Sequence, residues 1–522
     1  MDFQLKIDTH YGQAWQKVSN GYVSATAFLG ERYLDADGWA EIMAELKSPE
    51  DAVALVSKLN GSFAIALTFA DTLFLCVDRR RTIPLFYEIA HDTATVYNHI
   101  GLDKIKQNGA NTAAVDFLEY CLFIPGVETA AKGVRQVMAG QYLLINCCGA
   151  VTQNTYVSDV QIDQYPDREK LMALIDRKFI ETTKRLITVL NGRRAVIPLS
   201  GGHDSRLIVY YLKHLGYDNI LTYTYGPKGN FESETSKKVA DFLGLEWHFV
   251  RYKPKKLQKQ FRSEFRKVAD YYSDGVSSVC VQEWYALNNL KERNIIKDGD
   301  VLVPGHSFDC ISGSFILPRY VQNDVITKDA LFADILWKHF NEGMRVLPPP
   351  ALEKIRQTVE CTVLKYASDT MTAQQAFGLY QRYNIAERQA KYICHQVRLY
   401  EYYGLSWYLP LWDRELVDFW ESIPLKMKYN RQLFRDFTEY KYAALMAAAP
   451  IYNQKTKGTK PPCMHPVWRV IRKAWQLLDY VGTHYCLAYF SRMKVYKVFF
   501  STKILAIGYM VNQEMKKLFL EE

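Results

Sequence analysis

The sequence predicts two domains, an α+β sandwich followed by an α/β domain built on a parallel sheet with a helical C-terminal region. Its 522 residues exceed what one ordinary hydrophobic core accommodates. Up to about residue 155, short apolar or alternating runs are separated by Gly, Asn and Asp, a pattern typical of antiparallel strands. From about residue 165, strand-like and helix-like segments alternate, which predicts a doubly wound parallel sheet.

The first region, residues 1–155, is expected to form an α+β module with an antiparallel sheet. Strands are predicted within 21–30, 61–78 and 140–153, where apolar residues cluster or alternate. The run 61–78 predicts a hairpin that turns near Ala70-Asp71. One helical stretch, residues 37–59, lies between the strands.

The second region, residues 165–460, begins with apolar residues at helical spacing over 163–190. Strands are then expected at 194–200, 219–226, 246–252 and 300–305, and helices at 206–216 and 232–244. Helical sequence dominates from about residue 255 onward. Residues 461–522 form a basic, aromatic extension.

Composition restricts the functional classes. Hydrophobic residues make up 48% and charged residues 23%, as in globular proteins, and no nucleic-acid motif accompanies the net charge of +9. The ten cysteines form no CxxC pair and no cluster of zinc spacing, so they are expected to be mostly buried apolar residues. The chain shows no secretory signal and no membrane-length apolar run, which favours the cytoplasm.

The strongest chemical signal is the segment SGGHDS, residues 200–205, between a predicted strand and a predicted helix. Paired glycines let a backbone approach a phosphate, and a helix N-terminus offers free amide donors with a favourable dipole. Serine hydroxyls add donors, and the carboxylate of Asp204 can hold Mg²⁺ beside the phosphates. A glycine turn that merely starts a helix is the alternative, but strand, loop and helix in register favour ATP.

This loop resembles the SGGxDS pyrophosphate-binding loop of the asparagine synthetase superfamily, whose members cleave ATP between the α and β phosphates. It differs from a Walker A sequence, and no GxxxxGK[ST] is present. Four more segments resemble the family in the same order: 59–87, 115–145, 303–315 and 403–437. The resemblance covers about residues 20–460 and implies an amidotransferase-like (Ntn-type) sandwich followed by an adenine-nucleotide-hydrolase-like sheet.

The resemblance also implies roles for single residues. Asp204 and Asp309 match the two aspartates that hold Mg²⁺, and Glu234 matches the acidic residue that opens the second helix of the nucleotide domain. The residues expected to cradle the β and γ phosphates are Ser200, Gly201, Gly202, Asp204 and Ser205.

Lys455 falls where the family places a lysine that stabilises leaving pyrophosphate. Charge that develops on pyrophosphate needs a cation aimed at it. A solvated loop lysine is the competing interpretation, because Lys457 and Lys460 follow closely.

The first domain departs from glutamine-dependent relatives, which begin Met-Cys and use that thiol as a nucleophile. Residue 2 is Asp2, and Cys76 is the first cysteine. Where relatives have an N-G-E segment in the glutamine pocket, the nearest sequence is Leu29-Gly30-Glu31. Glutaminase activity is therefore not expected, and the domain is interpreted as a retained structural partner.

The segment 303–315 also departs from the family sequence. Relatives read G-E-G-x-D-E where this chain has His306 after Gly305, which puts aspartate as the substrate in doubt. A neutral His306 could act as a base toward an amine, since histidine titrates near neutral pH, and a packing role is the alternative. Arg431 replaces a family lysine ahead of Arg435, and both are interpreted as surface charges at a helix start.

The predicted reaction converts ATP and a carboxylate into acyl-AMP and pyrophosphate, after which ammonia or an amine forms an amide. The carboxylate could be aspartate, a sugar acid, a peptide side chain or a β-amino acid, and ammonia could be free or come from a separate amidotransferase. A non-catalytic ATP-binding scaffold is the alternative from another class. The basic extension could contact an anionic membrane or pack on the synthetase domain. The sequence leaves open whether the chain forms a homodimer.

Overall fold

The computed structural model describes residues 1–157, 160–165, 167–340, 347–449 and 504–521. The first region contains two sheets. The larger is seven-stranded and antiparallel, in the order β11 (Val151–Thr155), β10 (Gln141–Asn146), β6 (Thr72–Val77), β5 (Leu59–Phe69), β3 (Gly21–Leu29) and β2 (Gln16–Val18), with β4 (Arg32–Tyr33) beside β3. The smaller has β1 (Asp2–Lys6), β8 (Thr93–Tyr97), β7 (Phe86–Ala90) and β9 (Val134–Gln136), and β1 runs parallel to β8.

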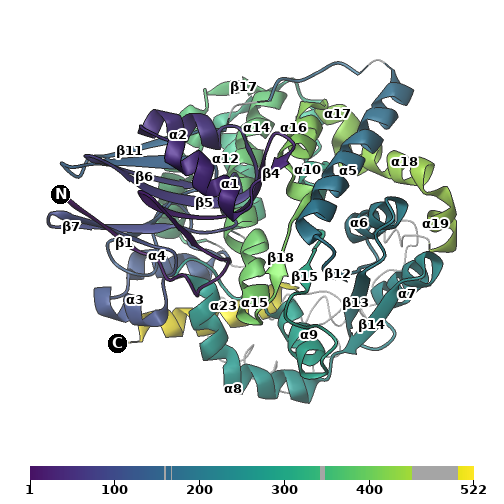
Figure 1. The fold of residues 1–522 in the computed structure, drawn as a ribbon. Coiled ribbons are helices and arrows are strands. Elements are labelled where there is room, and N and C mark those ends of the chain that lie inside the picture. The colour runs from purple at the N-terminus through teal and green to yellow at the C-terminus, as the bar shows by residue number, and fades with distance from the viewer. Residues whose placement is uncertain (158–159, 166, 341–346, 450–503, 522) are drawn as a thin grey trace.

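Alternating side chains give the larger sheet two buried faces. Phe63, Ile65 and Leu67 of β5 pack against α1 (Ala36–Glu45) and α2 (Pro49–Val56), which cover that face in Figure 1. Ala64 and Ala66 belong instead to the main core, together with residues of the smaller sheet. The antiparallel sheet with its helices and the hairpin at Ala70-Asp71 are confirmed. The predicted single helix over 37–59 is wrong, because Ser48 caps a second helix that has Pro49 in its first turn.

The second region contains the predicted parallel sheet of the α/β domain. Its five strands lie in the order β14 (Glu246–Arg251), β13 (Ile220–Gly226), β12 (Ala195–Pro198), β15 (Val301–Leu302) and β18 (Ser406–Trp407), and every neighbouring pair is parallel. Helix α5 (Arg168–Leu190) precedes the first of these strands, and the crossover helices α6 (His203–His214) and α7 (Phe231–Leu243) connect β12 to β13 and β13 to β14. The two-residue strand β18 was not predicted. All five carboxyl ends meet at one edge, where ligands bind in open α/β sheets.

The remaining elements of both regions are mainly helical. They are α3 (Leu102–Asn108), α4 (Thr112–Val115), η1 (Asp116–Glu119), α8 (Pro254–Ser273), α9 (Val281–Glu292), α10 (Phe308–Ile311), α11 (Arg319–Gln322), β16 (Val325–Thr327), α12 (Lys328–His339), α13 (Pro349–Thr362), η2 (Leu364–Tyr366), β17 (Thr370–Thr372), α14 (Ala373–Asn384), η3 (Ile385–Ile393), η4 (Cys394–Gln396), α15 (Val397–Tyr402), η5 (Pro410–Trp412), α16 (Arg414–Ser422), α17 (Leu425–Lys428), η6 (Tyr429–Arg431), α18 (Gln432–Lys441), α19 (Ala443–Ala448) and α23 (Ile504–Leu520).

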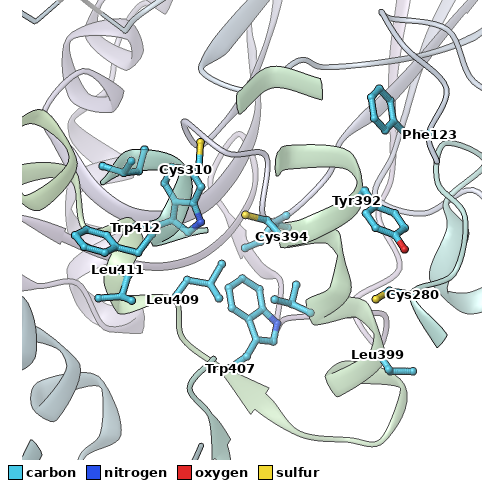
Figure 2. Close-up of a cluster of buried hydrophobic side chains, with 14 of the residues drawn as sticks. Phe123, Cys280, Cys310, Tyr392, Cys394, Leu399, Trp407, Leu409, Leu411 and Trp412 are labelled. Carbon is cyan, nitrogen blue, oxygen red and sulfur yellow. The ribbon is translucent and has the colours of Figure 1, made fainter. Parts of the chain in front are cut away.

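One continuous apolar core joins the two regions. Figure 2 shows part of it, where Phe123 of the first region lies in the same cluster as Tyr392 and Trp412 of the second. Of the eight described cysteines, five are buried, as expected, while Cys147, Cys148 and Cys361 are exposed. The predicted domain limits at residues 155, 165 and 460 stay predictions. Within the described ranges, no helix combines the length and apolarity needed to cross a bilayer.

The C-terminal helix α23 packs on the first region, against α3, α4 and η1, and Figure 1 shows it in yellow beneath that region. The buried Asn512 amide donates to the carbonyl oxygens of Leu118 and Cys121, both at 2.8 Å. Its carboxamide oxygen accepts from the hydroxyl of Ser278, so one side chain joins α23 to both regions. The predicted packing of the C-terminal helices on the synthetase domain is confirmed for α23 at Ser278 and Arg266, but its main helix–helix contacts are with the first region. Residues 461–503 lie outside the described residues.

Candidate functional site

The segment 200–205 lies at the carboxyl end of β12 and leads into α6. The α6 N-cap, Gly202, makes no side-chain capping bond, which leaves amide donors at this helix N-terminus without a side-chain partner. Within the loop, the Ser200 amide donates to the Ser205 hydroxyl oxygen at 3.1 Å, and the Gly202 amide donates to the Ser200 hydroxyl oxygen at 3.2 Å. These bonds shape a short loop whose helix end can receive an anion.

Two glycines allow neighbouring segments to approach this loop closely. A Cβ atom on Gly305 would lie 2.9 Å from the Ser205 amide nitrogen, and one on Gly201 would lie 3.4 Å from the Glu232 Cα atom. The loop after β15 and the start of α7 therefore both pack on segment 200–205. The structure brings together the two segments that carry Asp204 and Asp309.

Asp204 is paired with Arg431, a cation that was predicted to be a surface charge at a helix start. The Arg431 guanidinium donates to the Asp204 carboxylate, and Arg431 also lies over the Phe434 ring, 4.7 Å from its centroid. The interpretation of Arg431 as a surface charge is wrong, because its side chain is only 17% exposed. Burial raises the pKa of Asp204, Arg431 opposes that rise, and the nearby charge of Asp309 adds to it.

His306 lies on the loop after β15, half-buried, and its Nδ1 atom has no hydrogen-bond partner among the described residues. Burial lowers the pKa of His306 to about 4. The expectation that it titrates near neutral pH is therefore wrong. The ring is neutral at pH 7, as a base must be, but its basicity is weaker than that of an ordinary histidine.

Two further side chains next to the loop, Arg206 and His203, were not predicted as site residues. Arg206 is buried, and one nitrogen donates to the Ala449 carbonyl oxygen at 2.5 Å, while its Nε and second terminal nitrogen have no partner in the described part of the chain. Burial lowers the pKa of Arg206 to about 10. Burial and then the charge of Arg431 lower the pKa of His203 to about 3. A charged residue directly after Ser205 was the available sequence signal.

The structure does not direct the Glu234 side chain toward the loop. Glu234 lies in the first turn of α7, and its side chain is exposed to solvent. Lys455 lies outside the described residues.

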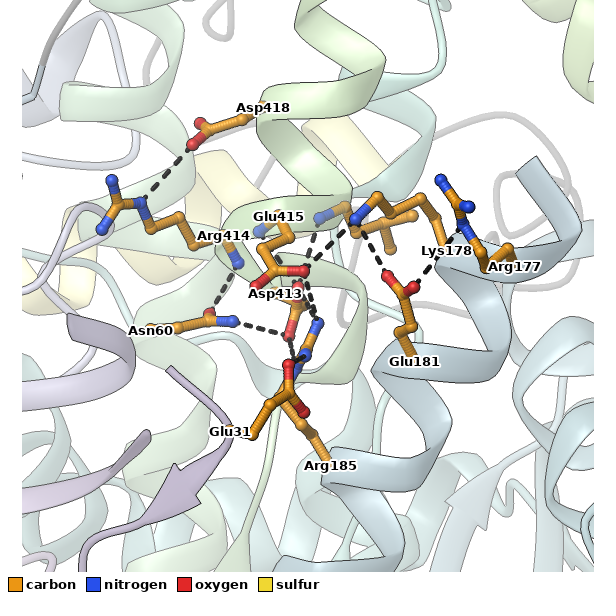
Figure 3. Close-up of polar contacts among 11 residues, drawn as sticks. Glu31, Asn60, Arg177, Lys178, Glu181, Arg185, Asp413, Arg414, Glu415 and Asp418 are labelled. Atoms are coloured by element: carbon orange, nitrogen blue, oxygen red, sulfur yellow. Dashed lines mark hydrogen bonds and ion pairs between the residues drawn. The ribbon is translucent and has the colours of Figure 1, made fainter. Parts of the chain in front are cut away.

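A second polar cluster lies between the two regions and centres on Asp413 (Figure 3). The buried Arg185 guanidinium binds both Asp413 oxygens, at 2.6 and 3.0 Å. The Asn60 amide of β5 donates to Asp413 at 2.9 Å, and Asp413 caps α16 by accepting from the Glu415 and Leu416 amides. Three distant chain segments thus meet at one carboxylate.

A cleft of about 560 Å³ lies beside this cluster and is lined by both regions. Gly30, Lys58 and Asn60 line it from the first region, and Lys178 and Arg414 line it from the second. Glu31, which follows Gly30, forms an ion pair with Arg185 at 3.5 Å. Part of the segment that resembles the glutamine pocket therefore contacts the synthetase region.

Asp2 lies far from this cleft. The Met1 amine donates to the Cys147 carbonyl oxygen, at the turn after β10. That turn lies by the Phe69 end of β5, whereas Leu29 pairs with Leu59 at its other end. The two ends of β5 are roughly 33 Å apart at 3.3 Å per residue. A side chain at position 2 therefore does not reach Glu31.

The family model for asparagine synthase matches residues 192–455, from just before β12 through the Asp309 loop and α16. This chain belongs to the asparagine synthase family. A 7-cyano-7-deazaguanine synthase of Staphylococcus aureus is 34% identical over 64 residues, which is 12% of this chain and 29% of that protein. The match thus spans less than a third of the curated relative.

Several solved structures are similar at low identity. An NH3-dependent NAD synthetase from Campylobacter jejuni is 12% identical, with 39% of this chain and 98% of that chain covered and a TM-score of 0.22. A glutamine-dependent NAD+ synthetase from Acinetobacter baumannii is 11% identical, with 53% and 64% covered and a TM-score of 0.21. A glutamine phosphoribosylpyrophosphate amidotransferase from B. subtilis is 12% identical, with 45% and 72% covered and a TM-score of 0.18. Scores this low do not establish a shared fold.

Proposed function

We propose that this member of the asparagine synthase family is an ATP-dependent amide-forming ligase that activates a carboxylate as acyl-AMP. The observation that carries the proposal is the site at the end of β12. An uncapped helix N-terminus there lies beside two aspartates and two arginines. Amide donors and cations suit the phosphates of ATP, and paired carboxylates suit Mg²⁺.

In the proposed reaction, a carboxylate oxygen attacks the α-phosphorus of ATP and pyrophosphate leaves. The nitrogen of ammonia or an amine then attacks the acyl carbon, AMP leaves, and the nitrogen loses a proton. The chain's part is to hold the reactants in line and to stabilise the charge that develops. Ser200, Gly201, Gly202 and Ser205 would receive the β and γ phosphates.

Asp204 and Asp309 would hold Mg²⁺, which supplies charge neutralisation at the phosphates. Geometry supports this assignment: a Cβ atom on Gly305 would lie 3.3 Å from the Asp204 Cβ atom, so the loop that carries Asp309 packs directly on Asp204. Among the described residues, no group of three or more His, Cys, Asp and Glu side chains could hold a metal ion. Phosphate oxygens and water would therefore complete the coordination, as is usual for Mg²⁺.

Arg431 and Arg206 are proposed to bind the leaving pyrophosphate beside Lys455, whose role stays a proposal from resemblance. His306 is proposed to accept a proton from the attacking amine; its ring is unprotonated at pH 7 and would act as a weak base. The first region is proposed to be an Ntn-type amidotransferase-like module without its nucleophile. Ammonia would then be free or come from a separate amidotransferase.

A non-catalytic ATP-binding scaffold is the second candidate, and one observation favours it. The Arg431 guanidinium pairs with the Asp204 carboxylate, so Mg²⁺ would compete with this partly buried cation for the same carboxylate. The ligase remains the better proposal, because the chain belongs to the asparagine synthase family and keeps both aspartates to which the resemblance assigns Mg²⁺.

Identification of the nucleotide products tests the ligase proposal. The protein is incubated with ATP, Mg²⁺ and ammonium against aspartate, glutamine, uronic acids and β-amino acids. Release of AMP and pyrophosphate with one carboxylate, and its loss in Asp204→Asn, is the expected result. ATP that binds tightly and stays intact with every carboxylate would support the scaffold instead.

A further inference from the structure

One exposed face of α8 is densely cationic. Lys255, Lys259 and Arg262 follow one another at helical spacing and lie on the same side of the helix. Together with Gln258 and Ser263 they line a hollow of about 370 Å³. Every one of these five side chains can donate a hydrogen bond. We call these five residues the α8 face.

The cations of the α8 face have no ion-pair partner in the described part of the chain. Arg251, Lys253 and Lys256, next to it in sequence, are exposed and also lack ion pairs within those residues. The nearest acidic residue on the helix, Glu264, is half-buried, while Arg266 further along pairs with Glu521. Like charges one helical turn apart repel each other, and an anionic ligand would relieve that repulsion.

The α8 face begins at the catalytic edge of the sheet. β14 is parallel to β13, and β13 is parallel to β12, so Arg251 ends its strand at the same edge as segment 200–205. The helix follows three residues later, at Pro254. A chain-like ligand with one group at Asp204 could therefore extend across two strands onto the α8 face.

The α8 face offers no apolar anchor. Its exposed residues are Lys, Gln, Arg and Ser, whereas Leu257 and Phe261 pack on the main core. The described large hydrophobic side chains that are exposed all lie on other elements. Membrane-surface helices and peptide sites use apolar contacts, and single-stranded nucleic-acid sites typically add stacking aromatics to their cations. Donors and cations alone suit a hydroxyl-rich polyanion.

We propose that the α8 face binds an acidic polysaccharide, a chain of sugar acids one of whose carboxylates reaches segment 200–205 for activation. This inference rests on the proposed function and names its substrate class. One polymer supplies both the reacting carboxylate and the charges that bind to Lys255, Lys259 and Arg262. The electrostatic attraction also raises the encounter rate at low salt.

Binding of a fluorescent oligogalacturonate, without ATP, tests the inference on the full chain. Lys255→Gln/Lys259→Gln/Arg262→Gln is compared with Lys170→Gln/Arg177→Gln/Lys184→Gln, three exposed cations on α5 that remove the same charge. The α8 variant should bind about tenfold more weakly, since three exposed pairs each contribute modestly. The α5 control should bind like the unaltered protein, and thermal unfolding checks that both variants fold.

Equal binding by the α8 variant and the control would overturn the inference, as would no binding by the unaltered protein. Tighter binding of a single-stranded DNA of equal charge, or of phosphatidylglycerol vesicles, through the same residues would also overturn it. With free galacturonate as substrate, the α8 variant should keep its rate, while its KM for the oligomer should rise about tenfold. Oligomer binding without AMP formation would reject the proposed function alone.

Discussion

The Arg431 guanidinium and the Asp204 carboxylate form an ion pair across 227 residues of sequence, at the start of α6. Arg431 and Asn430 before it have left-handed backbone angles, with φ of 59° and 54°. Such φ values are strained for residues other than glycine. The fold therefore holds Arg431 against the proposed metal carboxylate at a conformational cost, which indicates a role for the pair.

Arg431→Gln is expected to slow adenylation by about 10- to 100-fold with a smaller change in the KM for ATP, because the cation acts mainly on charge that develops as pyrophosphate leaves. Single-turnover AMP formation measures this step. The matched control is Arg168→Gln, which removes an ion pair with Asp436 on the neighbouring helix α18, where Arg168 is 66% exposed. An equal loss of rate in Arg168→Gln would show that Arg431 has only a structural role.

Asp413→Asn is expected to destabilise the protein by about 3–5 kcal/mol, because it leaves the Arg185 charge buried without a full partner. Urea unfolding measures the loss. Glu415→Gln is the control: Glu415 lies 3.5 Å from the same guanidinium and is 40% exposed, so at most about 1 kcal/mol is expected. If Asp413→Asn and Glu415→Gln cost the same, the Asp413 cluster does not hold the two regions together.

Asn512→Ala should loosen the C-terminal helix, because three polar partners on both regions lose their bonds while still buried. The expected cost is about 1–3 kcal/mol, with faster amide hydrogen exchange in residues 511–520. Gln513→Ala removes a partly buried bond to Glu119 at 3.2 Å and serves as the comparison. Unchanged exchange in Asn512→Ala would contradict the docking of α23.

His395 predicts acid sensitivity. Its ring is fully buried and forms a 2.6 Å hydrogen bond to the Tyr272 carbonyl oxygen, and burial lowers its pKa to about 3. A pKa lower in the folded than in the unfolded state gives stability that is complete above about pH 6.5 and is lost as the pH falls. Between pH 6.5 and 5 the loss is at most about 2 kcal/mol for this group.

Thermal unfolding across pH 5–7 measures this dependence in the unaltered protein and in His395→Gln, whose amide does not titrate. The variant should show a flatter decline toward pH 5. Parallel curves for the two proteins would show that His395 does not contribute to acid sensitivity.

Much of the scaffold could be predicted because its signals are local. Glycines and short apolar runs placed β12, β13 and β14 and the turn into α6 within a few residues. The strand β18 could not be found this way: Ser406 and Trp407 form a strand only because β15 lies beside them. The split of the first helical stretch at Ser48 and Pro49 was available from capping signals and was overlooked.

The candidate site residues of segments 200–205 and 305–309 were predicted from local sequence and stay predictions, while the structure shows that the two segments are in contact. The contacts of Arg431, Arg206 and Asp413 depend on tertiary approach over more than 200 residues of chain. The predicted titration of His306 near neutral pH was wrong for a related reason: burial lowers its pKa, and that burial is set by distant segments. The spacing of residues in the sequence predicts neither these tertiary contacts nor the burial of His306.

Oxygen transfer tests the central claim most directly. The carboxylate identified by AMP release is labelled with ¹⁸O on both oxygens and incubated with ATP, Mg²⁺ and ammonia or the amine, and the products are weighed by mass spectrometry. Formation of an acyl-AMP predicts one ¹⁸O atom in each AMP released, because the bridging oxygen leaves with the phosphate. Label in inorganic phosphate together with ADP, or unlabelled AMP, would contradict the account.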